Sequence, residues 1–91
     1  MTNAEFIVCL RRAKDIAMKL YPDESCIYDA CDIVFNLPCG WNRECKFVYP
    51  DGDVSPSFYW VVNHCHSPAD IALVFDNSIA DRQREISEGK P

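Results

Sequence analysis

The chain has 91 residues, of which 48% are hydrophobic and 25% are charged, and its formal net charge is −5. A chain of this length holds one hydrophobic core, so we expect a single domain over residues 1–91. No stretch approaches the roughly 18 apolar residues of a membrane span. Charged side chains begin at Glu5, which argues against an export signal. We therefore expect a cytoplasmic protein that does not bind membranes.

The charge is distributed unevenly along the chain. Residues 1–22 carry four basic and two acidic side chains, a net +2, whereas residues 23–76 carry two basic and nine acidic ones, a net −7. An acidic body disfavours direct binding of nucleic acid, because Lys and Arg bind the phosphates. It fits a basic protein partner, although the same charge also keeps a protein in solution.

The first segment predicts an amphipathic helix over about residues 3–20. Thr2 and Glu5 have the spacing of a capping box, and Tyr21-Pro22 ends the helix because a residue before proline avoids the helical region. The apolar residues recur at intervals of three and four: Phe6, Cys9, Leu10, Ala13, Ala17 and Leu20.

A second helix is predicted from Asp23 or Ser25 to about Leu37, where Pro38 stops it. Its apolar residues form one stripe: Ile27, Ala30, Cys31, Val34 and Leu37. Asp29 and Asp32 lie outside this stripe, on the side that we expect to face solvent.

The rest of the chain predicts strands at residues 45–49, 57–64 and 70–75, and a short helix over about 78–88. We therefore expect an α+β fold. Two N-terminal helices precede a small antiparallel three-stranded sheet, and a short C-terminal helix follows it.

Residues 23–77 contain a cysteine at a helix start, then an aromatic strand, then a strand that runs into an aspartate. This order resembles the papain-like and transglutaminase-like cysteine fold. The resemblance implies Cys26 as the nucleophile, since a helix N-terminus stabilises a thiolate. It implies Asp76 as the carboxylate that orients a histidine base. That base should open the aromatic strand, but Phe58 occupies the position.

His64 is the alternative base. If strands 57–64 and 70–76 form a hairpin, Phe58 lies opposite Asp76, and His64 lies about 20 Å from it, at roughly 3.3 Å per residue. A base and its orienting carboxylate require about 3 Å. We therefore expect a degenerate, non-catalytic scaffold. A small cysteine hydrolase or transferase using Cys26, His64 and Asp76 remains the alternative.

Six cysteines are present: Cys9, Cys26, Cys31, Cys39, Cys45 and Cys65. Without an export signal we expect reduced thiols. Four residues offer a zinc site of two sulfurs and two nitrogens: Cys39, Cys45, His64 and His66. Five residues separate the two cysteines, more than the usual two to four. A zinc-stabilised domain therefore stays a second alternative, and we expect no cofactor.

Aromatic and acidic residues predict a binding surface: Asp29, Asp32, Trp41, Asp51, Asp53, Tyr59 and Trp60. Aromatic anchors amid carboxylates are typical of surfaces that bind basic proteins, although aromatics also form the core of small sheets. Tyr59 and Trp60 are adjacent, so they face opposite sides of a strand. The expected function is a small acidic protein-binding module. An inhibitor, an antidote or a phage-type counter-defence protein would fit, acting on a basic protein surface.

Overall fold

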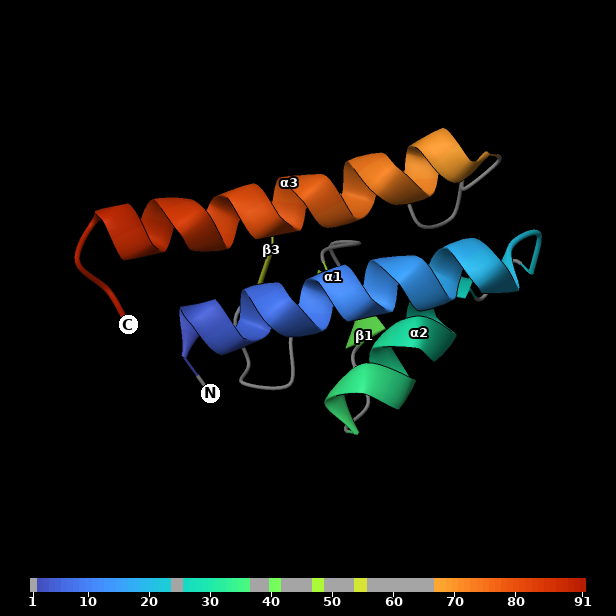
Figure 1. Ribbon diagram of the computed structural model, residues 1–91, viewed down its shortest axis with the longest axis horizontal. Coiled ribbons are helices and arrows are strands. Elements are labelled where there is room, and N and C mark those ends of the chain that lie inside the picture. Colours follow the sequence, from blue (N-terminus) through green and yellow to red (C-terminus); the bar gives the residue numbers. More distant parts are fainter. Residues whose placement is uncertain (1, 24–25, 37–39, 42–46, 49–53, 56–66) are drawn as a thin grey trace.

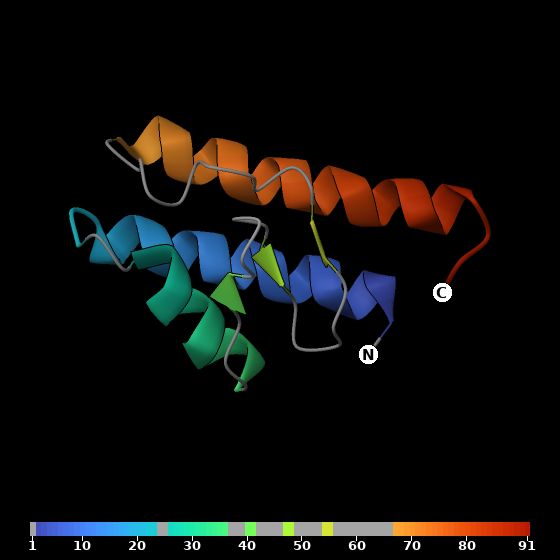
Figure 2. The same cartoon turned by 180° about the vertical axis from the view of Figure 1, so that it is seen from behind.

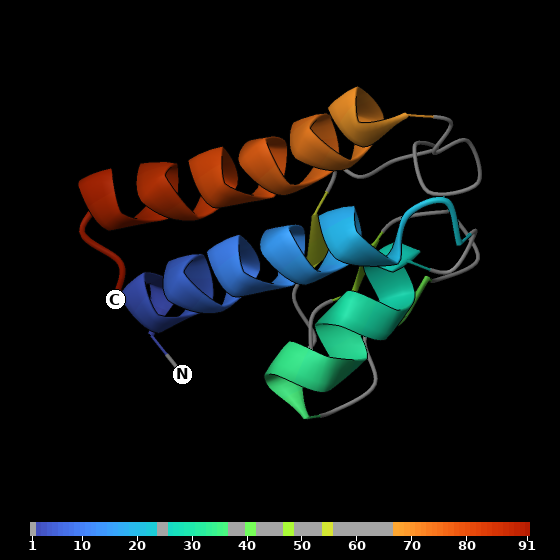
Figure 3. The same ribbon diagram turned by 45° about the vertical axis from the view of Figure 1, so that its right-hand side comes forward.

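The computed structural model describes residues 2–23, 26–36, 40–41, 47–48, 54–55 and 67–91. In this part of the chain three α-helices dominate: α1 (Asn3–Leu20), α2 (Cys26–Phe35) and α3 (Pro68–Ser87). Helices α1 and α3 run antiparallel and side by side (Figure 1). Helix α2 packs on the other flank of α1, so that α1 lies between its two partners (Figure 3).

The sequence predicted α1 correctly, including both of its ends. The hydroxyl of Thr2 accepts a hydrogen bond from the Glu5 N–H at 3.2 Å, and the Glu5 carboxylate accepts one from the Thr2 N–H at 3.2 Å. Tyr21 leaves the helix in an extended conformation before Pro22, with ψ of 135°. The buried side chains of α1 recur with the helical period: Asn3, Phe6, Ile7, Leu10, Ala13 and Ala17.

Helix α2 begins at Cys26, within the predicted range, and ends at Phe35. Asn36 follows with a positive φ of 54°, a left-handed conformation that commonly ends a helix and that Asn tolerates better than most residues. The predicted last residue, Leu37, lies outside the described residues. The helix buries Cys26, Ile27, Ala30, Cys31 and Phe35.

Helix α3 overturns the prediction for the C-terminal part of the chain. Residues 70–75, expected as a strand, form the first turns of a 20-residue helix, and the expected short helix over 78–88 is its second half. Ser67 caps this helix by accepting a hydrogen bond from the Asp70 N–H at 3.3 Å, and Pro68 occupies its first turn. Its buried face comprises Ile71, Val74, Phe75, Ser78, Ile79 and Arg82.

The described strands are three pieces of two residues each: β1 (Gly40–Trp41), β2 (Phe47–Val48) and β3 (Val54–Ser55). They pair antiparallel in the order β1-β2-β3, with Trp41 opposite Phe47 and Val48 opposite Val54. They lie behind the helices in Figure 1 and in front of them in Figure 2.

The expected α+β fold is therefore wrong, because the described chain is a three-helix assembly in which strands are a minor part. β2 falls within the expected strand 45–49, and the expected strand 57–64 lies outside the described residues.

Phe6 joins all three helices. Its ring lies 5.4 Å from that of Phe35 in α2, at an interplanar angle of 42°. The guanidinium of Arg82 in α3 lies over the same ring, 4.1 Å from its centroid. Arg82 is buried, and it donates a hydrogen bond of 3.0 Å to the side-chain oxygen of Asn3 in α1. These contacts fix the start of α1 to the second half of α3.

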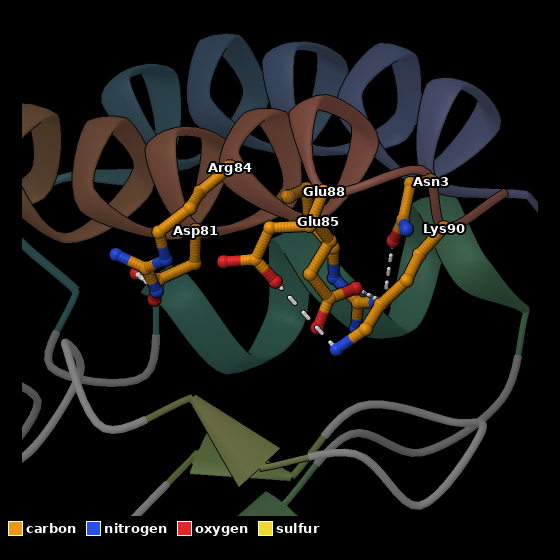
Figure 4. Close-up of polar contacts among 7 residues, drawn as sticks. Asn3, Asp81, Arg84, Glu85, Glu88 and Lys90 are labelled. Carbon is orange, nitrogen blue, oxygen red and sulfur yellow. Dashed lines mark hydrogen bonds and ion pairs between the residues drawn. The ribbon is translucent and has the colours of Figure 1, made fainter.

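Two surface ion pairs lie at the C-terminal end of α3. Asp81 pairs with Arg84 at 2.9 Å, and Glu88 pairs with Lys90 at 3.7 Å (Figure 4). Pairs of this exposed kind contribute little to stability. Within the described ranges, no helix is both long enough and apolar enough to cross a bilayer.

Candidate functional site

Cys26 is the first residue of α2, as the sequence predicted, but its thiol belongs to the hydrophobic core. Its side chain is 1% exposed and lies among other buried core residues. Burial raises the pKa of the Cys26 thiol, and the carboxylates of Asp23 and Asp29 raise it further. Hydrogen bonds from the backbone of Ile27 and of Cys26 itself lower the pKa, but they have less effect than burial. The geometry favours a neutral thiol, whereas a nucleophilic cysteine needs a lowered pKa.

Asp76 does not lie at the end of a strand. It occupies the exposed side of α3 and accepts a hydrogen bond of 2.9 Å from Lys14 of α1. Because residues 70–76 are helical, the hairpin that would have set Phe58 opposite Asp76 does not form. Phe58 and His64 themselves lie outside the described residues. Asp76 therefore acts as one half of an ion pair between α1 and α3.

The zinc alternative falls outside the described residues, because Cys39, Cys45, His64 and His66 all belong to segments that are not described. Within the described ranges, no group of three or more His, Cys, Asp or Glu side chains is arranged to hold a metal ion.

Three of the seven predicted binding residues lie in the described ranges. Asp29 and Asp32 are in α2, and the backbone of Trp41 is in β1. Asp51, Asp53, Tyr59 and Trp60 lie outside the described residues.

An exposed apolar side chain follows the two carboxylates of α2. Ile33 is 61% exposed, the highest value among the large hydrophobic residues described. Asp29 precedes it by one helical turn and Asp32 is its direct neighbour; i and i+4 side chains lie close together on a helix surface. We call these three residues the acidic surface of α2.

The carboxylates in and next to the acidic surface of α2 repel one another electrostatically. Partial burial raises the pKa of Asp29, and the charges of Asp23 and Asp32 raise it further. A side-chain hydrogen bond with Asp23 acts in the same direction, because two carboxyl groups can share a bond only if one keeps a proton. Residues 20–42 contain no Lys or Arg at all. The negative charge is thus not neutralised within its own segment.

A groove between α1 and α3, about 510 Å³ in volume, is the other candidate site. Its lining comprises Arg11, Lys14, Asp15, Asp76, Ile79 and Gln83. Two cations and two carboxylates cancel in charge, and the Lys14–Asp76 pair joins the two helices there. The groove is open and carries no net charge that would select a ligand, so the acidic surface of α2 is the stronger candidate.

No protein-family model matches the chain, and the searches of curated proteins and of solved structures found no similar protein. The site therefore has to be judged from its own residues. The sequence analysis named Asp29 and Asp32 as candidates but did not name Ile33. Ile33 lies outside the predicted apolar stripe of α2, which was the signal for its exposure in the sequence.

Proposed function

We propose that this protein is a small acidic module that binds a basic protein surface through α2. The observation that carries the proposal is the exposed Ile33, one helical turn after Asp29 and next to Asp32 in the sequence, on a helix without any Lys or Arg. An apolar side chain can anchor a partner by losing its contact with water. The carboxylates around it select a basic partner and accelerate the encounter.

The electrostatics of α2 support a binding role over a purely structural one. Its first turn tolerates acidic residues, but Asp32 lies in the second half, where the helix dipole is negative. The last turn holds no basic residue to offset this. The exposed face of α2 thus concentrates negative charge without a basic residue of its own helix. Lys or Arg side chains of a partner would neutralise it.

Binding without chemistry is the mode of action that fits these residues. A buried thiol with a raised pKa is poorly suited to nucleophilic attack. An inhibitor, an antidote or a phage-type counter-defence protein acts by covering a surface of its target, and a small acidic helical protein is suited to cover a basic one.

The test is affinity capture with quantitative mass spectrometry, using two variants matched in charge. Asp29→Lys with Asp32→Lys changes the acidic surface of α2 by four charge units. Asp15→Lys with Glu88→Lys makes the same change at exposed positions of α1 and of the end of α3. We expect the first variant to lose a basic partner by about tenfold or more, and the second to retain most of it.

Circular dichroism must show that both variants keep their helices. Equal losses in the two variants would mean that net charge alone drives the binding. Full retention by the α2 variant would show that the partner binds elsewhere, and the proposal would then be wrong.

A further inference from the structure

The outer side of α1 carries the complement of the acidic surface of α2. Val8 is 57% exposed, and Arg11 and Arg12 follow it at i+3 and i+4 and are exposed as well. Neither guanidinium is ion-paired with another described residue. We call Val8, Arg11 and Arg12 the basic surface of α1. Like its counterpart on α2, it consists of one β-branched apolar side chain and two like charges within a turn.

The two surfaces also match in direction. When two helices pack antiparallel, a residue k positions after the contact point on one faces a residue k positions before it on the other. Val8 against Ile33 then sets Arg12, four positions later, opposite Asp29, four positions earlier. A parallel arrangement would place Arg12 beyond the described end of α2. The complementarity is therefore specific to the antiparallel arrangement.

We propose that a second copy of this chain is a partner of the acidic surface of α2, and that it docks with the basic surface of its own α1. The inference rests on the proposed function, because it assigns an occupant to the same surface. The docking is helix against helix. An extended segment would find few backbone partners along the middle of α2, where the N–H and C=O groups are bonded within the helix, whereas a helix brings its own backbone bonds already made.

The neighbouring charges are compatible with this docking. Glu5 lies three positions before Val8 and would face Asn36, three positions after Ile33, which is uncharged. Because α1 and α2 are neighbours, two copies related by a twofold axis would form the α1–α2 contact twice.

A contact of this kind is small, so we expect weak association that depends on concentration and on salt. The two ion pairs of a symmetric dimer would be screened as ionic strength rises. The two Val8–Ile33 contacts would not be screened, so salt should weaken the association without abolishing it.

The test is sedimentation equilibrium on the full chain with a charge swap. For the wild-type protein, the weight-average mass should rise with concentration at low salt and rise less at high salt. Arg12→Asp and Asp29→Arg should each lower the association constant by about tenfold, because each variant opposes like charges. An equimolar mixture of the two variants should restore the association between unlike chains. If the variants behave in this way, a weight-average mass that approaches or exceeds that of a dimer supports the contact.

The controls are Lys90→Asp and Glu88→Arg, which make the same charge changes at an exposed pair of the C-terminal end. They should associate like the wild type. Val8→Ser and Ile33→Ser should each weaken the association without changing the charge.

Two results would overturn the inference. One is a monomeric mass at protein concentrations up to about 1 mM in low salt. The other is a mixture of the swap variants that associates no better than either variant alone. The affinity capture above reports separately on the proposed function. If the protein is monomeric but the α2 variant loses its captured partner, only the self-association is wrong.

Discussion

Asp29 is the residue at which stability and the proposed binding function oppose each other. Partial burial and the nearby carboxylates of Asp23 and Asp32 raise its pKa in the folded protein. A raised pKa means that the folded state binds the proton of Asp29 more tightly than the unfolded state does. The resulting stabilisation is present at low pH and is lost as the pH rises through the folded-state pKa. At neutral pH the ionised carboxylate therefore destabilises the fold.

Asp29→Asn should for this reason raise the melting temperature at pH 7. The gain should shrink as the pH falls toward about 3, where the wild-type carboxyl group is also neutral. Melting curves followed by circular dichroism at both pH values would measure it. Asp15→Asn on the exposed face of α1 is the control and should change little. A lower melting temperature for Asp29→Asn at pH 7 would show that Asp29 forms a stabilising interaction, contrary to this account.

Cys26 shows how far single residues could be predicted. Its place at the helix start follows from Pro22, Asp23 and the apolar stripe, all visible in the sequence. Its burial was also open to prediction, because Cys26 precedes Ala30 by one turn and so shares its face. The resemblance to a cysteine enzyme drew attention to the thiol as a nucleophile. The helical period indicates a core residue, as the structure confirms.

At the scale of elements, α1 was predictable and α3 was not. In α1 the capping box, the apolar period and the proline all agree. In α3 the run Ile71-Ala72-Leu73-Val74-Phe75 is apolar and rich enough in strand-forming residues to be read as a strand. The helical period appears only when Ser78 and Arg82 are included, and both are polar residues that the fold buries. Tertiary packing overrode the local preference.

A local signal for the true start of α3 was nevertheless present in the sequence. Ser67 followed by Pro68 is the combination of an N-cap and a first-turn proline. The prediction assigned both residues to a loop between strands. Where apolar period and capping chemistry disagree, as they do here, the capping residues located the helix correctly.

Ser67→Ala tests this assignment. Loss of the hydrogen bond to the Asp70 N–H should destabilise the protein by about 1 kcal/mol. For a domain of this size the melting temperature should fall by about 4–8 °C. Ser67→Asn should restore most of the loss, because Asn is an equally good N-cap. Equal stability of the wild type and Ser67→Ala would mean that this cap does not help to start α3.

At the scale of the whole molecule, three helices meet at one aromatic ring. α1 lies between α2 and α3, and Phe6 contacts both Phe35 of α2 and Arg82 of α3. Arg82 stays buried because Asn3 accepts a hydrogen bond from it, Glu85 lies at ion-pair distance of 4.0 Å, and the ring of Phe6 attracts the cation. The sequence could place Phe6 in the core, but not in this role, which depends on Phe35 and Arg82, 29 and 76 positions away.

Phe6→Ala should therefore weaken the whole assembly rather than one helix. Truncation of a buried phenylalanine costs about 3–5 kcal/mol, a large part of the roughly 5–10 kcal/mol expected for a domain of this length. Here it also takes the aromatic face from the buried cation of Arg82. Val8→Ala, two positions along the same helix but exposed, should cost under about 0.5 kcal/mol. Urea unfolding followed by helical circular dichroism would compare the two, and all helical signal should be lost in one transition. If Phe6→Ala instead melted α2 alone and left the α1–α3 pair intact, Phe6 would not be the residue that joins the three helices.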